Sequence, residues 1–320
     1  MHAKALYITF SFGKISNAPR GRPQLQKTER TRILGTANMY RVLVKKDLAP
    51  QIKLVKVYAP DIAEKAQPGQ FVIIRKDEKG ERIPLTLADW EKEKGTITLI
   101  FQEVGVSTRK LGTLEVGQTI LNVVGPLGNP SDIKHHGTLA IACGGFAIAA
   151  AYPIAKAFKH SGNKVISILG ARTENLLILE NEMRDVSDEL YISTDDGSKG
   201  YKGFVRDLLK ALIEKGQSFD IVYAIGPPIM MKTVCEVTRP YGIKTIVSLN
   251  PIMVDGMGMC GACRVSVGGE TKFACVDGPE FDGHMVDFDV LIKRLRIYFP
   301  EERKADELYQ KLGKSRHGQA

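Results

Sequence analysis

The sequence lacks a long apolar segment and has few cysteines, and both absences limit what the chain can be. Its longest apolar run, residues 139–152, spans 14 residues and contains two glycines, whereas about 20 residues are needed to cross a bilayer. The first nine residues lack the apolar core and cleavage site of a secretion signal. Only five cysteines occur in 320 residues, too few for a disulfide scaffold. We therefore expect a cytoplasmic protein without a membrane span.

Most of the chain also lacks an excess of charge of one sign. The formal net charge is +9, but residues 1–38 contain seven Lys or Arg and a single Glu, so the other 282 residues carry only +3. The nearly equal numbers of positive and negative residues after residue 38 argue against nucleic-acid binding, which needs a concentrated basic surface. Residues 1–38 show little periodicity, and we expect a flexible basic extension there, with Met39 as a candidate start. Nucleic-acid binding by this extension alone is an alternative.

Three of the five cysteines lie close together near the end of the chain. With Asp255 they form the pattern D-x4-C-x2-C-x11-C, at Cys260, Cys263 and Cys275. This is the spacing of a plant-type [2Fe–2S] loop with aspartate in place of the first thiolate. Glycines at 256, 258 and 261 permit the left-handed backbone that a loop around a small cluster needs. The spacing predicts an iron–sulfur site, and it leaves Asp255 open as a ligand because Asp-Gly is also a common turn.

Two other interpretations of these cysteines stay open at this point. Cys260, Cys263 and a later cysteine could join His284 in a structural zinc site, since zinc binds thiolate and imidazole tetrahedrally. The thiols could also be ordinary core residues, because free cysteine packs as a small hydrophobic side chain.

Residues 39–132 have the pattern of a small antiparallel β-barrel. Short runs rich in Val, Ile, Leu and Thr alternate with turn dipeptides such as Pro68-Gly69 and Lys94-Gly95, and most have no helix between them. Several strands at this spacing are typical of a barrel. The expected strands span residues 40–44, 52–58, 70–74, 84–88, 96–101 and 119–124.

Two segments of the expected barrel contain residue types that can hold a dinucleotide. Residues 82–86 combine a guanidinium that can pair with phosphate, a rigid proline and a hydroxyl. Residues 105–108 open an expected short helix, whose first N–H groups can bind pyrophosphate. Each feature is also common on surfaces that bind nothing, so that alternative stays open. The candidate flavin-binding residues are Arg82, Pro84, Leu85, Thr86, Gly105, Val106, Ser107 and Thr108.

From residue 133 to residue 247 the pattern changes to alternating strands and helices. This alternation predicts a mostly parallel, doubly wound sheet, in which ligands bind beyond the carboxyl ends of the strands. The expected strands are 138–143, 164–170, 189–194, 221–226 and 245–249, and the expected helices are 148–160, 176–185, 203–215 and 228–239.

The ends of these strands are polar or rich in glycine, which favours a crevice for a nicotinamide dinucleotide. The first exit, residues 144–147, is not the G-x-G-x-x-G fingerprint, so a strict Rossmann assignment is not made. The candidate NAD-binding residues are Gly144, Gly145, Phe146, Ala147, Gly170, Ala171, Arg172, Asp195, Asp196, Gly226, Pro227 and Met230.

Beyond a cluster-binding subdomain at residues 248–284, residues 285–320 are expected to form two helices. Apolar side chains at 288, 291, 292 and 295 follow helical spacing and predict a stripe that packs on the body of the protein or on another subunit. Pro300 then separates this helix from a second, charged one.

The order of these parts resembles the ferredoxin reductase-like electron-transfer subunits. These include the small subunits of dihydroorotate dehydrogenase B and of the electron-bifurcating NADH-dependent ferredoxin:NADP oxidoreductase, and sulfide dehydrogenase and sulfhydrogenase diaphorase subunits. The resemblance covers residues 39 to about 299. It is carried by residues 82–86, 105–108, 170–174, 226–231 and the cysteine loop, whereas Phe146-Ala147 stands where such relatives often have a glycine.

Aspartate in place of the first cysteine is similar to the bifurcating small subunit, since the dihydroorotate subunit usually has four cysteines. The resemblance therefore implies Asp255 as a cluster ligand beside Cys260, Cys263 and Cys275. It also implies FAD on the barrel and NADH as the nucleotide of the α/β domain. The residues themselves leave NADPH open, because Arg172 could bind a 2′-phosphate and Glu174 a ribose hydroxyl.

The implied activity is electron transfer between NAD(H), FAD and a [2Fe–2S] cluster, within a complex that carries out flavin-based electron bifurcation. The chain has no second iron–sulfur motif. We therefore expect a heterodimer with a larger subunit that carries another FAD and [4Fe–4S] clusters, and contact with ferredoxin through that complex. One alternative is a diaphorase subunit of a sulfide, polysulfide or dihydroorotate dehydrogenase complex. Another is a non-catalytic, zinc-stapled nucleotide-binding module.

Overall fold

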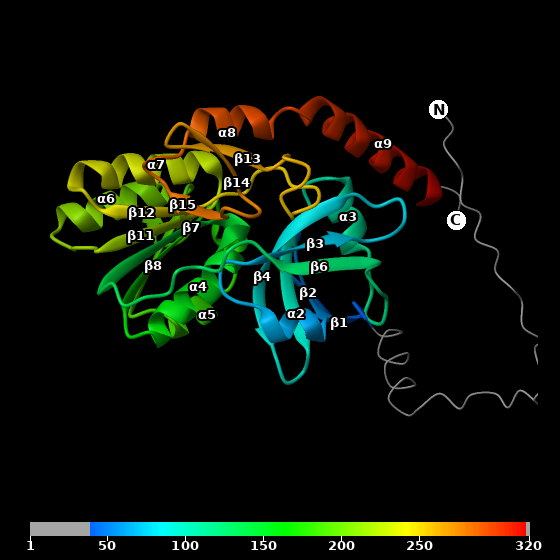
Figure 1. The fold of residues 1–320 in the computed structure, drawn as a ribbon, viewed down its shortest axis with the longest axis horizontal. Helices are drawn as coiled ribbons and strands as arrows, with labels where there is room; N and C mark the ends of the chain where they lie inside the picture. The colour runs from blue at the N-terminus through cyan, green and yellow to red at the C-terminus, as the bar shows by residue number, and fades with distance from the viewer. Residues whose placement is uncertain (1–38, 318–320) are drawn as a thin grey trace, which may run out of the picture. The chain divides into compact units, whose positions relative to one another are not determined.

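The computed structural model describes residues 39–317, which fall within one compact unit, Asn38–Ala320. Figure 1 shows the ribbon of this unit. The extension predicted for residues 1–38 lies outside the described residues. Among residues 39–317, no helix is both long and apolar enough to cross a membrane.

The first part of the unit is a six-stranded antiparallel sheet in the order β1-β2-β5-β4-β3-β6. The sheet closes on itself, because the N–H of Ile120 donates to the carbonyl of Tyr40 (3.0 Å) and the N–H of Gly117 to that of Val42 (2.8 Å). The predicted antiparallel barrel is confirmed. Its strands are β1 (Val42–Ala49), β2 (Ile52–Tyr58), β3 (Phe71–Arg75), β4 (Arg82–Glu91), β5 (Thr96–Gln102) and β6 (Asn122–Leu127), with helices α2 (Pro60–Lys65) and α3 (Val106–Gly112).

The second part is a seven-stranded sheet in the order β10-β9-β8-β7-β11-β12-β15, parallel except for β15. Strand order reverses between β7 and β11, which is the switch point where such sheets bind ligands. The predicted doubly wound domain is confirmed. Its strands are β7 (Thr138–Gly144), β8 (Lys164–Ala171), β9 (Glu189–Thr194), β10 (Tyr201–Lys202), β11 (Ile221–Ile225), β12 (Lys244–Ser248) and β15 (Glu280–Asp282).

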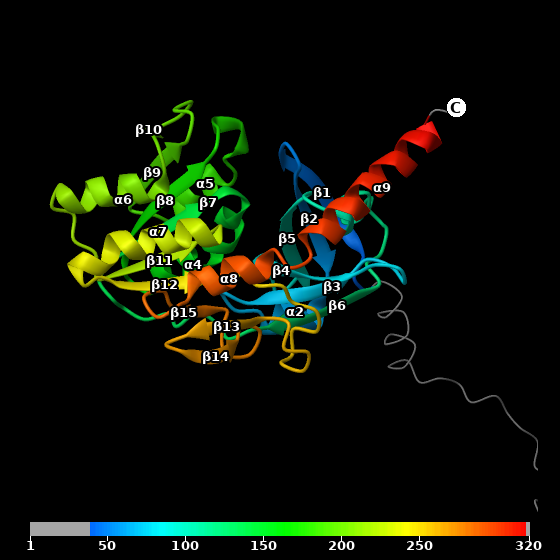
Figure 2. The same cartoon turned by 90° about the horizontal axis from the view of Figure 1, so that it is seen from above.

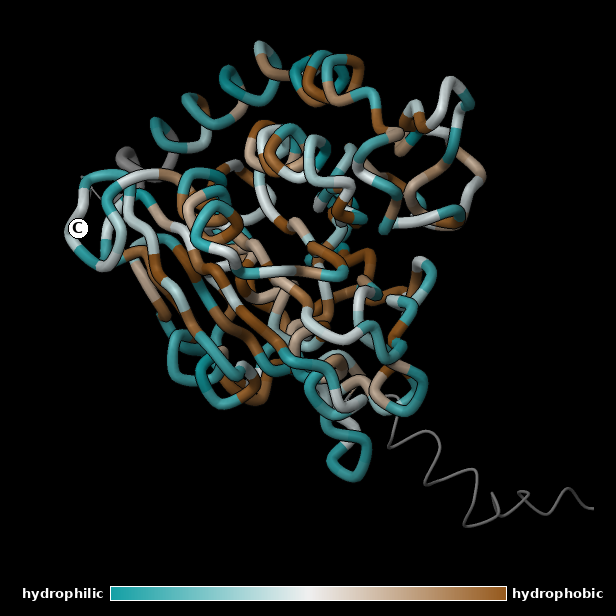
Figure 3. Tube along the Cα trace, turned by 90° about the vertical axis from the view of Figure 1, so that its left-hand side faces the viewer, coloured by the Kyte–Doolittle hydropathy of each residue, from teal (hydrophilic) through white to brown (hydrophobic). Residues whose placement is uncertain are grey.

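Helices cover both faces of this sheet, and alternate strand residues face each layer. Leu139 and Ile141 of β7 pack on the side of α4 and α5, while Ala140 and Ala142 pack on the side of α6, α7 and α8 (Phe288–Leu295). This period of two follows from the pleat of a strand. Figure 3 shows the strands as largely apolar and the outer turns of the helices as polar. The helices are α4 (Ile148–His160), α5 (Glu180–Asp185), α6 (Val205–Glu214) and α7 (Pro228–Thr238), with the short helices η1 (Gly145–Ala147), η2 (Glu174–Leu176) and η3 (Arg239–Tyr241).

The barrel has its own apolar core, and a second apolar cluster joins it to the parallel sheet. Ile52 and Ile100 of the barrel lie in the same buried cluster as Ile148 and Ile154 of α4. Because burying such side chains contributes roughly 1.5–3 kcal/mol each, this contact stabilises the packing of the barrel against the parallel sheet.

The last part consists of a hairpin and two helices. Gly268 and Gly269, both at positive φ, form the turn of the hairpin, and the predicted apolar stripe buries Phe288 and Leu291 against the sheet. Figures 1 and 2 show the last helix running from α8 past the barrel. The elements are β13 (Arg264–Val267), β14 (Glu270–Phe273), α8 (Phe288–Leu295) and α9 (Phe299–His317).

The structure departs from the predicted elements at a few places. The helix predicted at 176–185 is divided into η2 and α5, because Leu179 between them adopts a left-handed conformation with φ +54° that no continuous helix allows. Pro300 lies in the first turn of α9 rather than ahead of it, a position that suits its fixed φ. The predicted domain boundaries at residues 132, 247 and 284 stay predictions.

Candidate electron-transfer site

The structure brings two of the predicted cluster ligands together. The sulfur atoms of Cys263 and Cys275 lie 3.2 Å apart, both residues are only 2% exposed, and neither is in a disulfide. Burial and the neighbouring Cys263 thiol raise the pKa of Cys275 to about 12. Both cysteines lie in an apolar cluster with Phe71 and Ile73 of the barrel. The two sulfur atoms are therefore shielded from water and close to the predicted flavin-binding sheet.

Asp255 is fixed in the same loop by its carboxylate. Oδ1 accepts a hydrogen bond from the N–H of Met257 (2.8 Å) and Oδ2 accepts one from the N–H of Cys260 (2.7 Å). These N–H groups, Met257 first, hold the pKa of Asp255 below its usual range. The carboxylate is therefore charged and tied to the backbone of the exposed Cys260.

The predicted four-ligand set is not gathered as a whole. Within residues 39–317, no group of three or more His, Cys, Asp or Glu side chains is placed to hold a metal ion. The donor chemistry nevertheless fits an iron–sulfur cluster: two buried thiols lie side by side without a covalent link, and Gly256, Gly258 and Gly261 all have positive φ. His284, the fourth ligand of the zinc alternative, has its Nε2 3.0 Å from Thr238 Oγ1 instead.

In the barrel, the predicted flavin-binding segments lie at one edge. Arg82 begins β4 and is exposed, and Leu85 and Thr86 follow it, half-buried, beside β3. The Ser107 hydroxyl donates to Glu81 Oε2 at 2.5 Å. The Thr108 hydroxyl accepts from the N–H of Gly105 (3.2 Å) and so also serves to cap α3. No sequence pattern indicates the role of Glu81, because this contact joins residues that lie 26 positions apart.

In the parallel sheet, glycines end two adjacent strands at the switch point. Gly144 is the last residue of β7, and Gly226 follows β11, the parallel neighbour of β7. A Cβ at either position would lie within 3 Å of Met230, at 2.7 Å from its sulfur for Gly144 and 2.9 Å from its methyl group for Gly226. Gly145, at φ +63°, has open space beside it. These glycines allow the close backbone approach that a dinucleotide needs.

The segments that follow β8 and β9 at their carboxyl ends lie beside each other as well. The N–H of Asp195 donates to the carbonyl of Ala171 (3.1 Å) and the N–H of Asp196 to that of Arg172 (3.2 Å). Burial raises the pKa of Asp195, and the Arg172 charge opposes that rise. The predicted residues of β8 and β9 therefore form one polar rim.

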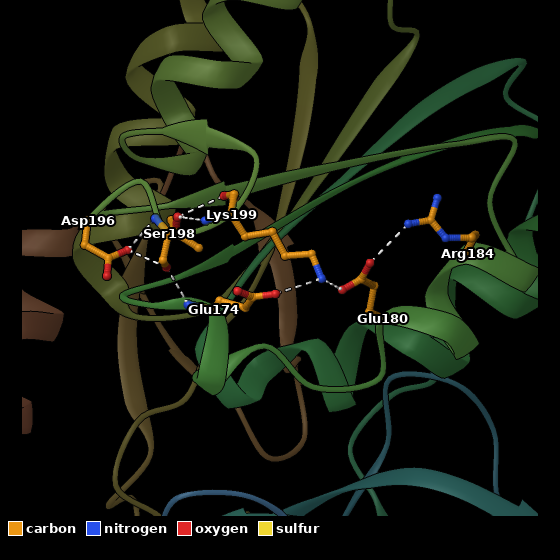
Figure 4. Close-up of polar contacts among 7 residues, drawn as sticks. Glu174, Glu180, Arg184, Asp196, Ser198 and Lys199 are labelled. Atoms are coloured by element: carbon orange, nitrogen blue, oxygen red, sulfur yellow. Dashed lines mark hydrogen bonds and ion pairs between the residues drawn. The ribbon is translucent and has the colours of Figure 1, made fainter.

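A network that the sequence did not reveal holds this rim. Figure 4 shows Lys199 between Glu180 and Glu174, with Nζ 2.7 Å from Glu180 Oε2 and 3.5 Å from Glu174 Oε1. Ser198 Oγ accepts from the N–H of Glu174 at 2.8 Å. The hydrogen bond to Glu180 is the first cause of the raised pKa of Lys199. Only the fold brings these side chains together, so no sequence spacing could have predicted the network.

A closed antiparallel barrel, a doubly wound sheet with glycine-rich strand exits and a loop with paired thiols define an oxidoreductase of the ferredoxin reductase-like class. Residues 141–236 match the family model described as oxidoreductase NAD-binding domain. Residues 250–287 match that of the iron-sulfur cluster binding domain of dihydroorotate dehydrogenase B. The cysteine loop thus falls within the second match.

Similar proteins cover nearly the whole chain. The dihydroorotate dehydrogenase B (NAD(+)), electron transfer subunit homolog of Thermotoga maritima is 48% identical over 87% of this chain and 98% of its own. The electron transfer subunit of dihydroorotate dehydrogenase B (NAD(+)) from Desulforamulus reducens is 32% identical over 77% of this chain and 96% of its own. The chain belongs to the family of dihydroorotate dehydrogenase B electron-transfer subunits and their homologues.

Solved structures agree with this assignment. One chain, from the structure of an NADH-dependent reduced ferredoxin-NADP oxidoreductase studied for flavin-based electron bifurcation, is 47% identical with a TM-score of 0.81, covering 85% of this chain and 98% of that one. The Amycolatopsis cytochrome P450 reductase GcoB, at 22% identity and a TM-score of 0.53 over 62% of this chain and 64% of its own, shares the fold.

Proposed function

We propose that the chain is the small subunit of an NADH-dependent ferredoxin:NADP oxidoreductase-type complex. In it, electrons pass between NADH, FAD and a [2Fe–2S] cluster, and the partner is a larger subunit with a second FAD and [4Fe–4S] clusters. The observation that carries this proposal is the match to the bifurcating oxidoreductase chain over nearly its full length, with the paired thiols of Cys263 and Cys275 inside the iron–sulfur region.

The residues present would hold the cofactors as follows. Asp255, Cys260, Cys263 and Cys275 would bind the cluster, whose chemistry with a bound flavin is the change between two-electron and one-electron transfer. The exposed guanidinium of Arg82 can pair with the flavin phosphates. The apolar cluster around Cys263 and Cys275 keeps water away from the two thiols. Because this cluster includes residues of β3, the thiols lie beside the sheet proposed to bind the flavin.

The rim beyond β8 and β9 supports NADH over NADPH. Its cations are paired with carboxylates: Lys199 with Glu180 and Glu174, and Arg184 with Glu180. Arg172 faces the charge of Asp195. A 2′-phosphate would find these cations already paired with carboxylates, while a 2′-hydroxyl can donate to a carboxylate.

Anaerobic purification of the native complex tests the proposal. We expect a coloured preparation with flavin and iron in the small subunit, flavin bleaching by NADH, and a larger iron–sulfur flavoprotein that co-purifies. A colourless protein containing zinc would overturn it. Co-purification with a dihydroorotate dehydrogenase catalytic subunit would favour the second candidate, a diaphorase subunit of that enzyme, which the relatives' names support.

A further inference from the structure

Two arginines donate hydrogen bonds to the backbone between the first two cysteines of the predicted cluster loop. Arg264 Nη1 donates to the carbonyl of Gly261 at 3.0 Å. Arg294 Nη2 donates to the carbonyl of Ala262 at 3.1 Å. Gly261 and Ala262 are the two residues that separate these cysteines in the sequence. Both guanidinium groups therefore lie against the part of the loop that spaces two of the predicted cluster ligands.

The packing of α8 brings Arg294 to this loop. Asp287 caps the helix, since its Oδ1 accepts a hydrogen bond from the N–H of Val290 at 2.9 Å, and the helix lies beside β13 (Figures 1 and 2). Its side chains at positions 288 and 291 are buried, with exposed fractions of 6% and 1%. Arg294 comes one helical turn after position 291 and is half-buried on the same face of the helix. Because this face is packed, the guanidinium is held against Ala262, which lies 32 residues away in the sequence.

The two guanidinium charges have no carboxylate partner in the described part of the chain. Among the described side chains neither arginine forms an ion pair, and the one acidic side chain of α8, Asp289, pairs with Lys232 at 2.8 Å. Arginine keeps its proton throughout the ordinary pH range. Each of the two side chains therefore adds a permanent positive charge beside the loop.

A positive charge near an iron–sulfur cluster favours the reduced form of the cluster. One added electron makes the cluster more negative by one unit of charge, so a nearby cation interacts more strongly with the reduced form than with the oxidised form. Net charge, hydrogen bonds and solvent exposure set the reduction potential of such clusters. Arg294 brings a half-buried charge, whereas Arg264 is exposed, so water and salt screen the charge of Arg264 more strongly.

We propose that Arg294 is a positioning residue for the iron–sulfur site, and that its charge raises the reduction potential of the cluster. This inference rests on the proposed function, which assigns the cluster to this loop. Arg294 acts without being a ligand: it restrains the loop through the Ala262 carbonyl, and its charge stabilises the reduced form. The exposed Arg264 contributes less, in the same direction.

The test compares four forms of the full chain, each purified anaerobically with its cluster: wild type, Arg294→Gln, Arg294→Lys and Arg296→Gln. Arg294→Gln keeps an N–H donor for the Ala262 carbonyl and removes the charge, whereas Arg294→Lys keeps the charge. Iron analysis gives the cluster content, and a redox titration followed by electron paramagnetic resonance gives the midpoint potential. For Arg294→Gln we expect the equilibrium constant for reduction of the cluster to fall about tenfold, which lowers the midpoint by ~59 mV for a one-electron couple. Arg294→Lys should stay close to wild type.

Arg296→Gln is the matched control. Arg296 follows α8 directly, is exposed, and donates no side-chain hydrogen bond to the described residues. Its replacement removes the same charge from the same end of the helix and should leave the midpoint unchanged. A further variant, Arg264→Gln, should lower the midpoint by less than Arg294→Gln does, and its effect should shrink as salt is added.

The proposal fails if Arg294→Gln has full iron content and the wild-type midpoint. It also fails if Arg294→Lys lowers the midpoint as much as Arg294→Gln does, because the charge then has no effect, or if both variants lose iron, because Arg294 then serves only to fold the loop. Loss of iron in Arg294→Gln alone, with full iron and a wild-type midpoint in Arg294→Lys, supports the proposal, since only the variant that keeps the charge keeps the cluster. If wild type itself holds no iron, the proposed function fails, and this result is distinct from all the others.

Discussion

The hydroxyl of Ser131 donates a 2.5 Å hydrogen bond to Oε1 of Glu280, joining two segments that lie 149 residues apart. Ser131 follows the last barrel strand, and Glu280 begins the edge strand of the parallel sheet. The backbone of Gly69 closes the site from the barrel side, since a Cβ there would lie 2.4 Å from the Ser131 oxygen. Burial raises the pKa of Glu280 to about 7, with a smaller contribution from Asp132. Tyr223 faces the same carboxyl group.

This contact predicts how stability depends on pH. Glu280 keeps its proton in the folded chain up to a pKa of about 7, while the unfolded chain releases it near the ordinary pKa of about 4.3. The folded state binds more protons between these values, so its stability falls as pH rises through that window, by an amount on the order of 2 kcal/mol. The side chain in Glu280→Gln stays neutral at both pH values. We therefore expect the stability of this variant relative to wild type to be greater at pH 8 than at pH 5.

Denaturant unfolding at pH 5 and pH 8 checks this, with Glu64→Gln on the exposed side of α2 as the control. The difference between wild type and Glu280→Gln should change with pH, whereas the difference for the control should not. If the unfolding midpoints of wild type and Glu280→Gln rise by the same amount from pH 5 to pH 8, the Glu280 carboxyl is not the group responsible.

A second prediction concerns the network around Lys199. Replacing both of its partners, by Glu174→Gln and Glu180→Gln, leaves the Lys199 charge free to attract a 2′-phosphate. We expect the preference for NADH over NADPH to fall about tenfold, equivalent to roughly 1.4 kcal/mol, mainly through tighter NADPH binding. Stopped-flow reduction of the flavin by each nucleotide measures this.

Glu214→Gln provides the matched control for this experiment, because Glu214 also pairs with a lysine, Lys210, on an exposed helix. It should leave the preference unchanged. If the double variant loses affinity for NADH and NADPH equally, the network only holds the loop in place and does not select the nucleotide.

Much of the fold was predictable because its signals are local. The apolar runs that became β7, β8 and β11 are each buried on both faces, so the sequence itself marks them as central strands. In contrast, β10 and β15 are two and three residues long and form only because a longer strand lies beside them. Their pairing depends on tertiary structure, and no periodicity of so few residues can indicate it.

The candidate site divides in the same way. Cys263 and Cys275 were predicted as neighbours because a metal-binding loop has a fixed spacing, and the structure places their sulfurs in contact. The contacts of Lys199 with Glu180 and of Arg109 with Asp306 span 19 and 197 residues. Such pairs form between surfaces that only the completed fold brings together, so the local sequence around each residue does not predict them.

A third prediction follows from a close approach in the nucleotide-binding sheet. A Cβ at Gly170 would lie 2.2 Å from Cγ2 of Val205, the first residue of α6. Because Val205 is buried and β-branched, it cannot move aside, and Gly170→Ala should destabilise the chain by about 1–3 kcal/mol. Adding Val205→Ala should recover part of that loss in denaturant unfolding. Strictly additive effects of the two substitutions would contradict the predicted clash.

The last prediction concerns the oxygen ligand. If Asp255 binds iron, Asp255→Cys should retain the cluster, since it restores the four-cysteine spacing, but should shift its reduction potential because the ligand charge and hydrogen bonding at one iron change. Asp255→Asn is the matched comparison: it keeps an oxygen that can accept the N–H of Met257 or Cys260 and loses the negative charge. Iron analysis together with a redox titration followed by electron paramagnetic resonance measures both properties. An unchanged midpoint in Asp255→Cys, with full iron content, would show that the carboxylate serves only to fold the loop through its two backbone hydrogen bonds.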